Sequence, residues 1–131
     1  MNLLLISIDS LRLDFVSRTN RQIQTPSFDD LTNNFCFYSK LFSTASATRP
    51  VHTSLFTGLY PFEHGILSQS STNMRCDIPT IFDLAENSGT EIKGFSEVNT
   101  LFSGLPYANK IVEYQPSEIH RALTTTSNYQ R

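Results

Sequence analysis

The sequence predicts an α/β fold in which helices flank a mostly parallel sheet. Leu3–Ile8 is a short apolar run with a β-branched end, which is typical of a strand buried on both faces of a parallel sheet. Helix-like and strand-like segments then alternate, which favours a parallel sheet with right-handed crossovers. The length of 131 residues is typical of one domain, and the chain shows no repeat, low-complexity tract or clear linker.

The elements before residue 48 follow from local signals. Asp9 comes directly after the first strand, beyond its carboxyl end, where open α/β sheets bind ligands. Thr25 and Pro26 predict a helix start, with the threonine as cap and the proline in the first helical position. The aromatic-rich segment Phe35–Phe42 predicts a second strand, whose carboxyl end leads into Ser43–Thr48.

A short helix is predicted from Pro50. Val51, Leu55 and Leu59 recur at every fourth residue and so share one face of this helix. Gly58 suits its C-terminal end, because a left-handed residue commonly ends a helix.

The remaining elements are a helix that starts near Pro79 and ends at Gly89, and two weaker strands. The strands are expected at Glu91–Phe95 and Lys110–Tyr114. Residues after about 115 are polar and rich in threonine, and they predict no element.

Composition limits the class of protein. Hydrophobic residues make up 39% and charged residues 17%, and the net charge of −2 provides no basic field for nucleic acid or an anionic membrane. Cys36 and Cys76 show no metal-binding or redox spacing. The N-terminus lacks the features of a signal peptide, and no segment reaches the about 18 apolar residues of a membrane span. We therefore expect a cytoplasmic protein that binds neither nucleic acid nor a membrane.

Thr48 is the candidate nucleophile. It stands at the start of the predicted helix, whose unpaired N–H groups and dipole attract an anion such as a phosphoryl or sulfuryl oxygen. Because a threonine hydroxyl is a weak nucleophile, direct metal coordination would have to activate it, and Asp9 is a hard oxygen ligand for such a metal. The alternative is that Thr48 only caps a helix and Asp9 only ends a strand.

Four further side chains are considered with Thr48. His52, one helical turn later, is able to orient Thr48 or to bond a bound anion, and a purely structural histidine fits the sequence equally well. Arg12 and Arg49 suit an anionic substrate, although surface arginines are commoner. His64 lies in a turn, and nothing in its spacing links it to Thr48, so we expect a structural role for it.

The chain resembles the sulfatase family of the alkaline phosphatase superfamily in three ordered blocks, ISIDSLRLDFV, TPSFDDLTNNFCFYSKLFSTAS and TRPVHTSLFTGLYPFEHGI. The resemblance covers roughly residues 2–67 and continues more faintly to about residue 95. The nucleophile motif of sulfatases reads Cys or Ser, any residue, Pro, any residue, Arg, and a Thr-Gly run follows. Thr57 and Gly58 fix the register, so the resemblance places Thr48 at the nucleophile and His52 at the arginine.

Two departures separate the chain from ordinary sulfatases. Sulfatases convert their Cys or Ser into formylglycine, which Thr48 cannot become, and Ser10 stands where many of them carry a second acidic residue. The Thr-x-Pro-x-His form, followed by Thr-Gly-Leu-Tyr-Pro, resembles instead the nucleotide pyrophosphatase/phosphodiesterase branch, in which a threonine attacks phosphorus directly. This implies an in-line displacement with a phospho-threonine intermediate, at a divalent metal ion (Zn, Mn, Ca or Mg).

The expected site has Thr48 and His52 as catalytic residues, Arg49 as a substrate-binding residue, and Asp9 and Thr48 as metal ligands. The further metal ligands of the family lie downstream and include an Asp-His pair, which this chain lacks; after His64 it has only one histidine. We therefore expect residues 1–131 to be the N-terminal portion of a sulfatase-like hydrolase domain whose C-terminal portion is absent. As a natural truncation, a fragment or one chain of a split enzyme, it would be weak or inactive alone.

The expected partners are a small-molecule phosphate or sulfate ester and a complementing C-terminal chain. Two alternatives stay open. One is a sulfuric ester hydrolase of the same fold, and the other is a non-catalytic α/β module that binds an anion or a partner chain.

Overall fold

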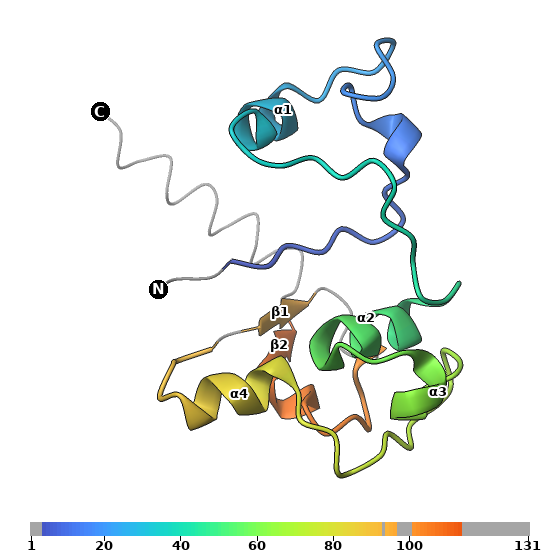
Figure 1. The fold of residues 1–131 in the computed structure, drawn as a ribbon, viewed down its shortest axis with the longest axis vertical. Helices are drawn as coiled ribbons and strands as arrows, with labels where there is room; N and C mark the ends of the chain where they lie inside the picture. Colours follow the sequence, from blue (N-terminus) through green and yellow to red (C-terminus); the bar gives the residue numbers. More distant parts are fainter. Residues whose placement is uncertain (1–3, 93, 97–100, 114–131) are drawn as a thin grey trace. The chain divides into compact units, whose positions relative to one another are not determined.

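The computed structural model describes residues 4–92, 94–96 and 101–113 (Figure 1). The chain divides into two compact units, Met1–Phe42 and Ser43–Arg131, and each is described by itself. The described elements are, in order, η1 (Leu13–Phe15), α1 (Pro26–Thr32), α2 (Thr48–Thr57), α3 (Pro61–His64), α4 (Ile81–Asn87), β1 (Gly94–Ser96), η3 (Ala108–Lys110) and β2 (Ile111–Glu113). No helix within the described ranges is long and apolar enough to cross a membrane.

The predicted helix start at Thr25 and Pro26 is confirmed by α1. Pro26 occupies the first helical turn, and Thr25 stands at the cap position. Its side chain makes no cap hydrogen bond, and its Oγ1 accepts from the N–H of Ser17, at 3.1 Å. The threonine therefore ties α1 to the segment that follows η1.

Neither strand predicted in the first unit forms within the described residues, which begin at residue 4 and so leave out Leu3. Leu4–Ile8 and Phe35–Phe42 lack strand structure along their whole described length. A strand exists only where a neighbour takes up its N–H and C=O groups, and an apolar pattern predicts burial without supplying that neighbour. The large apolar side chains of both segments are consequently exposed: Leu4, Leu5, Ile6, Ile8, Phe35, Phe37, Tyr38, Leu41 and Phe42.

The weaker strand signals of the second unit are confirmed, with shifted bounds. β1 and β2 form a two-stranded parallel sheet in which Gly94 pairs with Ile111 and Phe95 with Val112. A Cβ atom on Gly94 would lie 3.1 Å from Ile111 Cγ1, so a glycine suits this close approach of the strands. Tyr114, predicted as the end of β2, lies outside the described residues. The described chain is thus a mixed structure with helices and a small parallel sheet, rather than a larger sheet flanked by helices.

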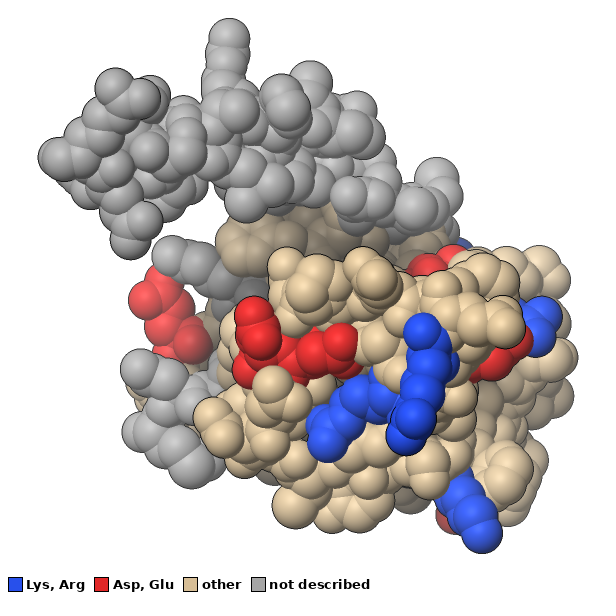
Figure 2. Space-filling model, turned by 90° about the horizontal axis from the view of Figure 1, so that it is seen from above, with Lys and Arg blue, Asp and Glu red and all other residues tan. Residues whose placement is uncertain are grey.

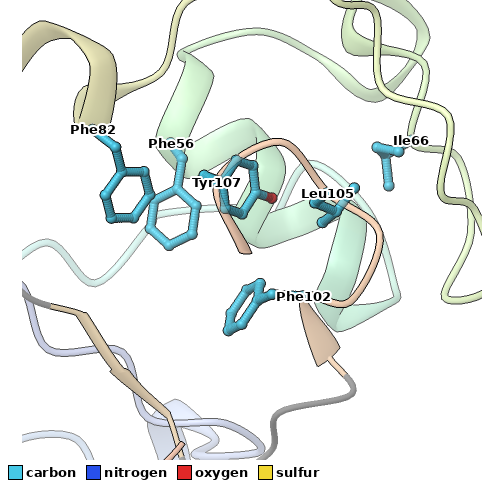
Figure 3. Close-up of a cluster of buried hydrophobic side chains, with 6 residues drawn as sticks. All are labelled: Phe56, Ile66, Phe82, Phe102, Leu105 and Tyr107. Carbon is cyan, nitrogen blue, oxygen red and sulfur yellow. The ribbon is translucent and has the colours of Figure 1, made fainter. Parts of the chain in front are cut away.

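An aromatic core holds the second unit together (Figure 3). Phe56 of α2 lies edge-on to Phe82 of α4, with ring centroids 5.0 Å apart, and to Tyr107, at 5.2 Å. Such edge-to-face pairs add to the stabilisation from buried area. The buried hydrophobic residues of this core are Phe56, Ile66, Phe82, Phe102, Leu105 and Tyr107.

The predicted apolar face of α2 is wrong, although the helix itself is confirmed. Leu55 is exposed, whereas Thr53 and Phe56 are buried. Aromatic rings from α4 and from the segment before β2 pack on Phe56, and this tertiary contact decides which face is buried. Gly58 ends the helix as predicted, with φ of 73° and its N–H donating to the Ser54 carbonyl at 2.8 Å.

The helix predicted near Pro79 is α4, which begins at Ile81. Thr80 caps it: the N–H of Thr80 donates to the Asp83 carboxylate at 2.7 Å, and the N–H of Asp83 donates back to the Thr80 hydroxyl at 3.4 Å. Gly89 follows the helix with φ of 68°. On the surface, basic and acidic side chains lie interspersed among uncharged residues on the face drawn in Figure 2.

Candidate functional site

Thr48 is the first residue of α2, and Ala47 rather than Thr48 is the N-cap. Ala47 has extended backbone angles and no side-chain acceptor, so it cannot satisfy the N–H groups that a helix leaves unpaired at its start. The alternative that Thr48 only caps the helix is therefore wrong, because the cap position belongs to Ala47. Its hydroxyl belongs to the first turn of the helix.

The N–H groups of this turn are less open to an anion than the sequence suggests. Pro50 has no N–H, and the N–H of Val51 donates to the Ala47 carbonyl at 3.3 Å. The N–H of Arg49 donates to the amide oxygen of Gln69 at 3.0 Å. The expectation that unpaired N–H groups at the helix start attract the anion is therefore wrong for these positions. The positive end of the helix dipole remains.

His52 is placed against Thr48 by its own helix. Its Nδ1 lies 2.9 Å from the carbonyl oxygen of Thr48, and the ring must donate there because a carbonyl only accepts. The ring also lies edge-on to Phe102, with centroids 5.6 Å apart. His52 thus contacts the backbone of Thr48, and its catalytic role stays a prediction.

Arg49 is buried, with 6% of its surface exposed. Its Nη1 donates to the carbonyl oxygens of Ser71, at 3.1 Å, and Ser103, at 2.9 Å. The guanidinium therefore joins two loops to the start of α2, and its predicted contact with substrate stays a prediction. Arg12 makes a two-point pair with Asp14, with N–O distances of 2.9 and 2.8 Å.

His64 has the structural role expected of it. It is fully buried, and its Nδ1 accepts from the N–H of Ile66 at 3.1 Å, so the proton of the neutral ring sits on Nε2. Nε2 then donates to the Ser54 hydroxyl at 3.0 Å. Burial lowers the pKa of His64, and a weaker opposing effect comes from the Pro50 carbonyl.

Asp9 is exposed and lies in a turn whose next residue is strained. Ser10 has φ of 59°, which a residue other than glycine rarely adopts. Strain of this kind clusters at functional sites, where it aims a neighbouring group. Asp9 belongs to the first unit and Thr48 to the second, so their sharing of one ion stays a prediction.

The described residues do not complete a metal site. Asp9 and Thr48 offer hard oxygen donors of the kind that divalent cations prefer. Within the part of the chain that the structure describes, however, no group of three or more His, Cys, Asp or Glu side chains is placed to hold a metal ion. Two donors are too few for a stable site, so further ligands would have to come from elsewhere.

Gln69 is the contact that the sequence did not reveal. It lies 20 residues after Arg49 and belongs to a Ser-rich loop that carries no motif. The only hint is indirect, since a helix that starts after Ala47 needs an acceptor from elsewhere in the fold.

Residues 3–89 match the family model described as type I phosphodiesterase / nucleotide pyrophosphatase. The matched range contains Asp9, Thr48, His52 and Gln69 and ends before β1. The predicted phosphodiesterase branch of the alkaline phosphatase superfamily is thereby confirmed, and membership of the sulfatase family is not shown. No curated protein and no solved structure matches the chain.

Proposed function

Because the chain belongs to the type I phosphodiesterase / nucleotide pyrophosphatase family, we propose that it forms the nucleophile-bearing part of a hydrolase for phosphate mono- or diesters. The observation that carries the proposal is the position of Thr48 at the first residue of α2, within the matched range. The positive end of the helix dipole favours the negative charge that develops on an attacking oxygen and on a phosphoryl group.

The reaction that suits this site is a displacement at phosphorus. The Thr48 oxygen forms a bond to phosphorus while the ester P–O bond breaks, and the threonine proton ends on the released alcohol. Water then cleaves the phospho-threonine and regenerates the hydroxyl. A nucleophile held on a rigid helix favours this chemistry, because the reacting oxygen is already oriented.

A divalent cation would be held by the Asp9 carboxylate and the Thr48 hydroxyl, together with ligands from outside the described residues. Such an ion lowers the pKa of the oxygen that it contacts and neutralises charge on the phosphoryl group. His52 holds the backbone of Thr48, and Arg49 holds the loops around it.

The test is transfer of a phosphoryl group to Thr48. The full chain, alone and with a C-terminal chain that carries an Asp-His pair, is incubated with bis(4-nitrophenyl) phosphate or 4-nitrophenyl phosphate and Zn²⁺ or Mn²⁺. Release of nitrophenol and a phosphoryl adduct on the peptide that contains Thr48 are expected. Thr48→Ala should abolish both signals and Thr48→Ser should retain them, since serine keeps the hydroxyl. Full activity of Thr48→Ala would refute the nucleophile.

A non-catalytic anion-binding module is the second candidate, because the described residues complete no metal site. Calorimetric binding of inorganic phosphate without any transfer from either ester would favour it. A sulfate-ester hydrolase requires hydrolysis of 4-nitrophenyl sulfate in preference to both phosphate esters, and Thr48 argues against it.

A further inference from the structure

We propose that Gln69 is a positioning residue of this site, which fixes the peptide group between Thr48 and Arg49 and thereby the direction of the Thr48 side chain. The contact is a property of the fold alone, whereas its consequence for catalysis rests on the proposed function.

Both polar atoms of this peptide group are held by side chains. Its N–H, from Arg49, donates to Gln69 Oε1 at 3.0 Å. Its C=O, from Thr48, accepts from His52 Nδ1 at 2.9 Å. A peptide group is planar, so two bonds on its opposite edges fix its rotation about the helix. Thr48 is the first residue of α2 and has a helical backbone, so the fixed peptide plane also fixes the direction of its Cα–Cβ bond. The hydroxyl then retains only rotation about that bond.

Gln69 is itself held in place by the residue that it contacts. Arg49 donates through its guanidinium to the carbonyl of Ser71, two residues after Gln69, at 3.1 Å. The hydroxyl of Ser71 in turn accepts from the N–H of Ser68 at 3.1 Å. The loop that carries Gln69 is thus attached to Arg49 at two points, the backbone N–H of Arg49 and its guanidinium group. This double attachment allows a surface glutamine to hold one geometry.

The chemistry of an amide suits this position. A helix start usually takes a hydroxyl or carboxylate cap, and Ala47 provides neither. A carboxylate would satisfy the Arg49 N–H but would repel an anionic ester beside Thr48. The neutral oxygen of Gln69 satisfies the donor and leaves the positive end of the helix available to the ester. Two substitutions therefore separate the effects of the acceptor and of the charge. Gln69→Leu removes the acceptor, and Gln69→Glu keeps the acceptor and adds a negative charge.

The first experiment measures hydrogen exchange of backbone amides in the full chain by NMR. In Gln69→Leu the Arg49 amide should exchange about tenfold faster, because its hydrogen bond is lost. The amide of Phe56 in the same helix should be unaffected. Gln69→Glu should restore slow exchange of the Arg49 amide, and the control Gln24→Leu, in the other unit, should change neither. Unchanged exchange of the Arg49 amide in Gln69→Leu, or faster exchange along all of α2, would overturn the proposal.

The second experiment follows phosphoryl transfer to Thr48 from bis(4-nitrophenyl) phosphate with Mn²⁺ in the same variants. Gln69→Leu should lower the rate at saturating ester about tenfold and leave the half-saturating concentration within about twofold. Gln69→Glu should keep the saturating rate and raise the half-saturating concentration, since only charge has been added. Equal saturating rates in Gln69→Leu and the unchanged chain would overturn the positioning role. Absence of transfer in the unchanged chain, both alone and with the C-terminal chain that carries an Asp-His pair, would refute the proposed function. The exchange measurement would still show whether Gln69 holds the Arg49 amide.

Discussion

The two units of the chain differ in how they use apolar residues. In the second unit, rings from α2, α4 and the segment before β2 meet in a buried cluster. In the described part of the first unit, Val16 alone among the hydrophobic residues is buried, and long apolar segments lie exposed. The sequence of the first unit is no less rich in hydrophobic residues than that of the second. The difference therefore comes from whether tertiary partners are present, and only the second unit supplies them within itself.

The strongest test of this difference between the units is to remove one phenylalanine ring from each. Phe56 is 7% exposed and contacts the rings of Phe82, Phe102 and Tyr107, whereas Phe42 is 85% exposed. Phe56→Ala should lower the free energy of unfolding by about 3–5 kcal/mol, because it removes buried surface and leaves a cavity. Phe42→Ala should change it by less than about 0.5 kcal/mol. Urea unfolding followed by circular dichroism measures both, and equal losses would show that Phe42 is buried in solution.

The same contrast explains what the sequence could predict. Helices satisfy their own backbone groups, so α1, α2 and α4 follow from local signals such as Pro26, Gly58 and Pro79. Strands need a partner, and the most apolar segments, Leu4–Ile8 and Phe35–Phe42, found none within their unit. The buried face of α2 was missed for the same reason, because Phe56 is chosen by rings that are distant in sequence.

In the candidate site too, contacts within one helix were predictable from the sequence, and contacts between distant segments were not. Thr48 and His52 lie on one helix, so their contact follows from a spacing of four residues. Gln69 reaches Arg49 across 20 residues of loop, and no local pattern marks it. Asp9 was predicted from its place directly after an apolar run. The strained backbone of Ser10 beside it appears only in the structure. Residues joined by local geometry were predicted, and those joined by tertiary folding were not.

Mild acid should weaken the second unit through His64, and the first unit contains no histidine. Burial lowers the pKa of His64 below its ordinary value of 6.5. Between that lowered pKa and pH 6.5, the unfolded chain binds a proton that the folded chain does not. The free energy of unfolding contributed by His64 is thus fully present above pH 6.5 and falls, by at most about 1.4 kcal/mol per pH unit, as the pH decreases through this window.

Urea unfolding between about pH 5.5 and pH 7.5 measures this slope. His64→Gln is the control, because glutamine can still meet the Ser54 hydroxyl but does not titrate. The slope should disappear in this variant even though its stability is lower throughout. A slope of equal size in His64→Gln would assign the effect to other groups.

The smallest expected effect compares one hydroxyl in each unit. Thr53 donates to the Arg49 carbonyl at 2.9 Å, so in its 2.8 Å contact with Tyr107 the tyrosine is the donor. Tyr107→Phe removes this donor and leaves the Thr53 proton satisfied, and the free energy of unfolding should fall by only about 1 kcal/mol. Tyr38, which is 75% exposed in the first unit, provides the matched Tyr38→Phe control, expected to have no effect.

Alkaline titration sharpens this last contrast. Burial raises the pKa of Tyr107 above its ordinary value of 10.0. Above pH 10 the unfolded chain therefore loses a phenol proton that the folded chain keeps, and the free energy of unfolding falls as the pH rises through the raised pKa. Absorbance of the phenolate should show a late-titrating tyrosine whose signal disappears in Tyr107→Phe and persists in Tyr38→Phe. If Tyr38→Phe removed it instead, Tyr38 would be the tyrosine shielded from water, and the contrast between these two hydroxyls would be reversed.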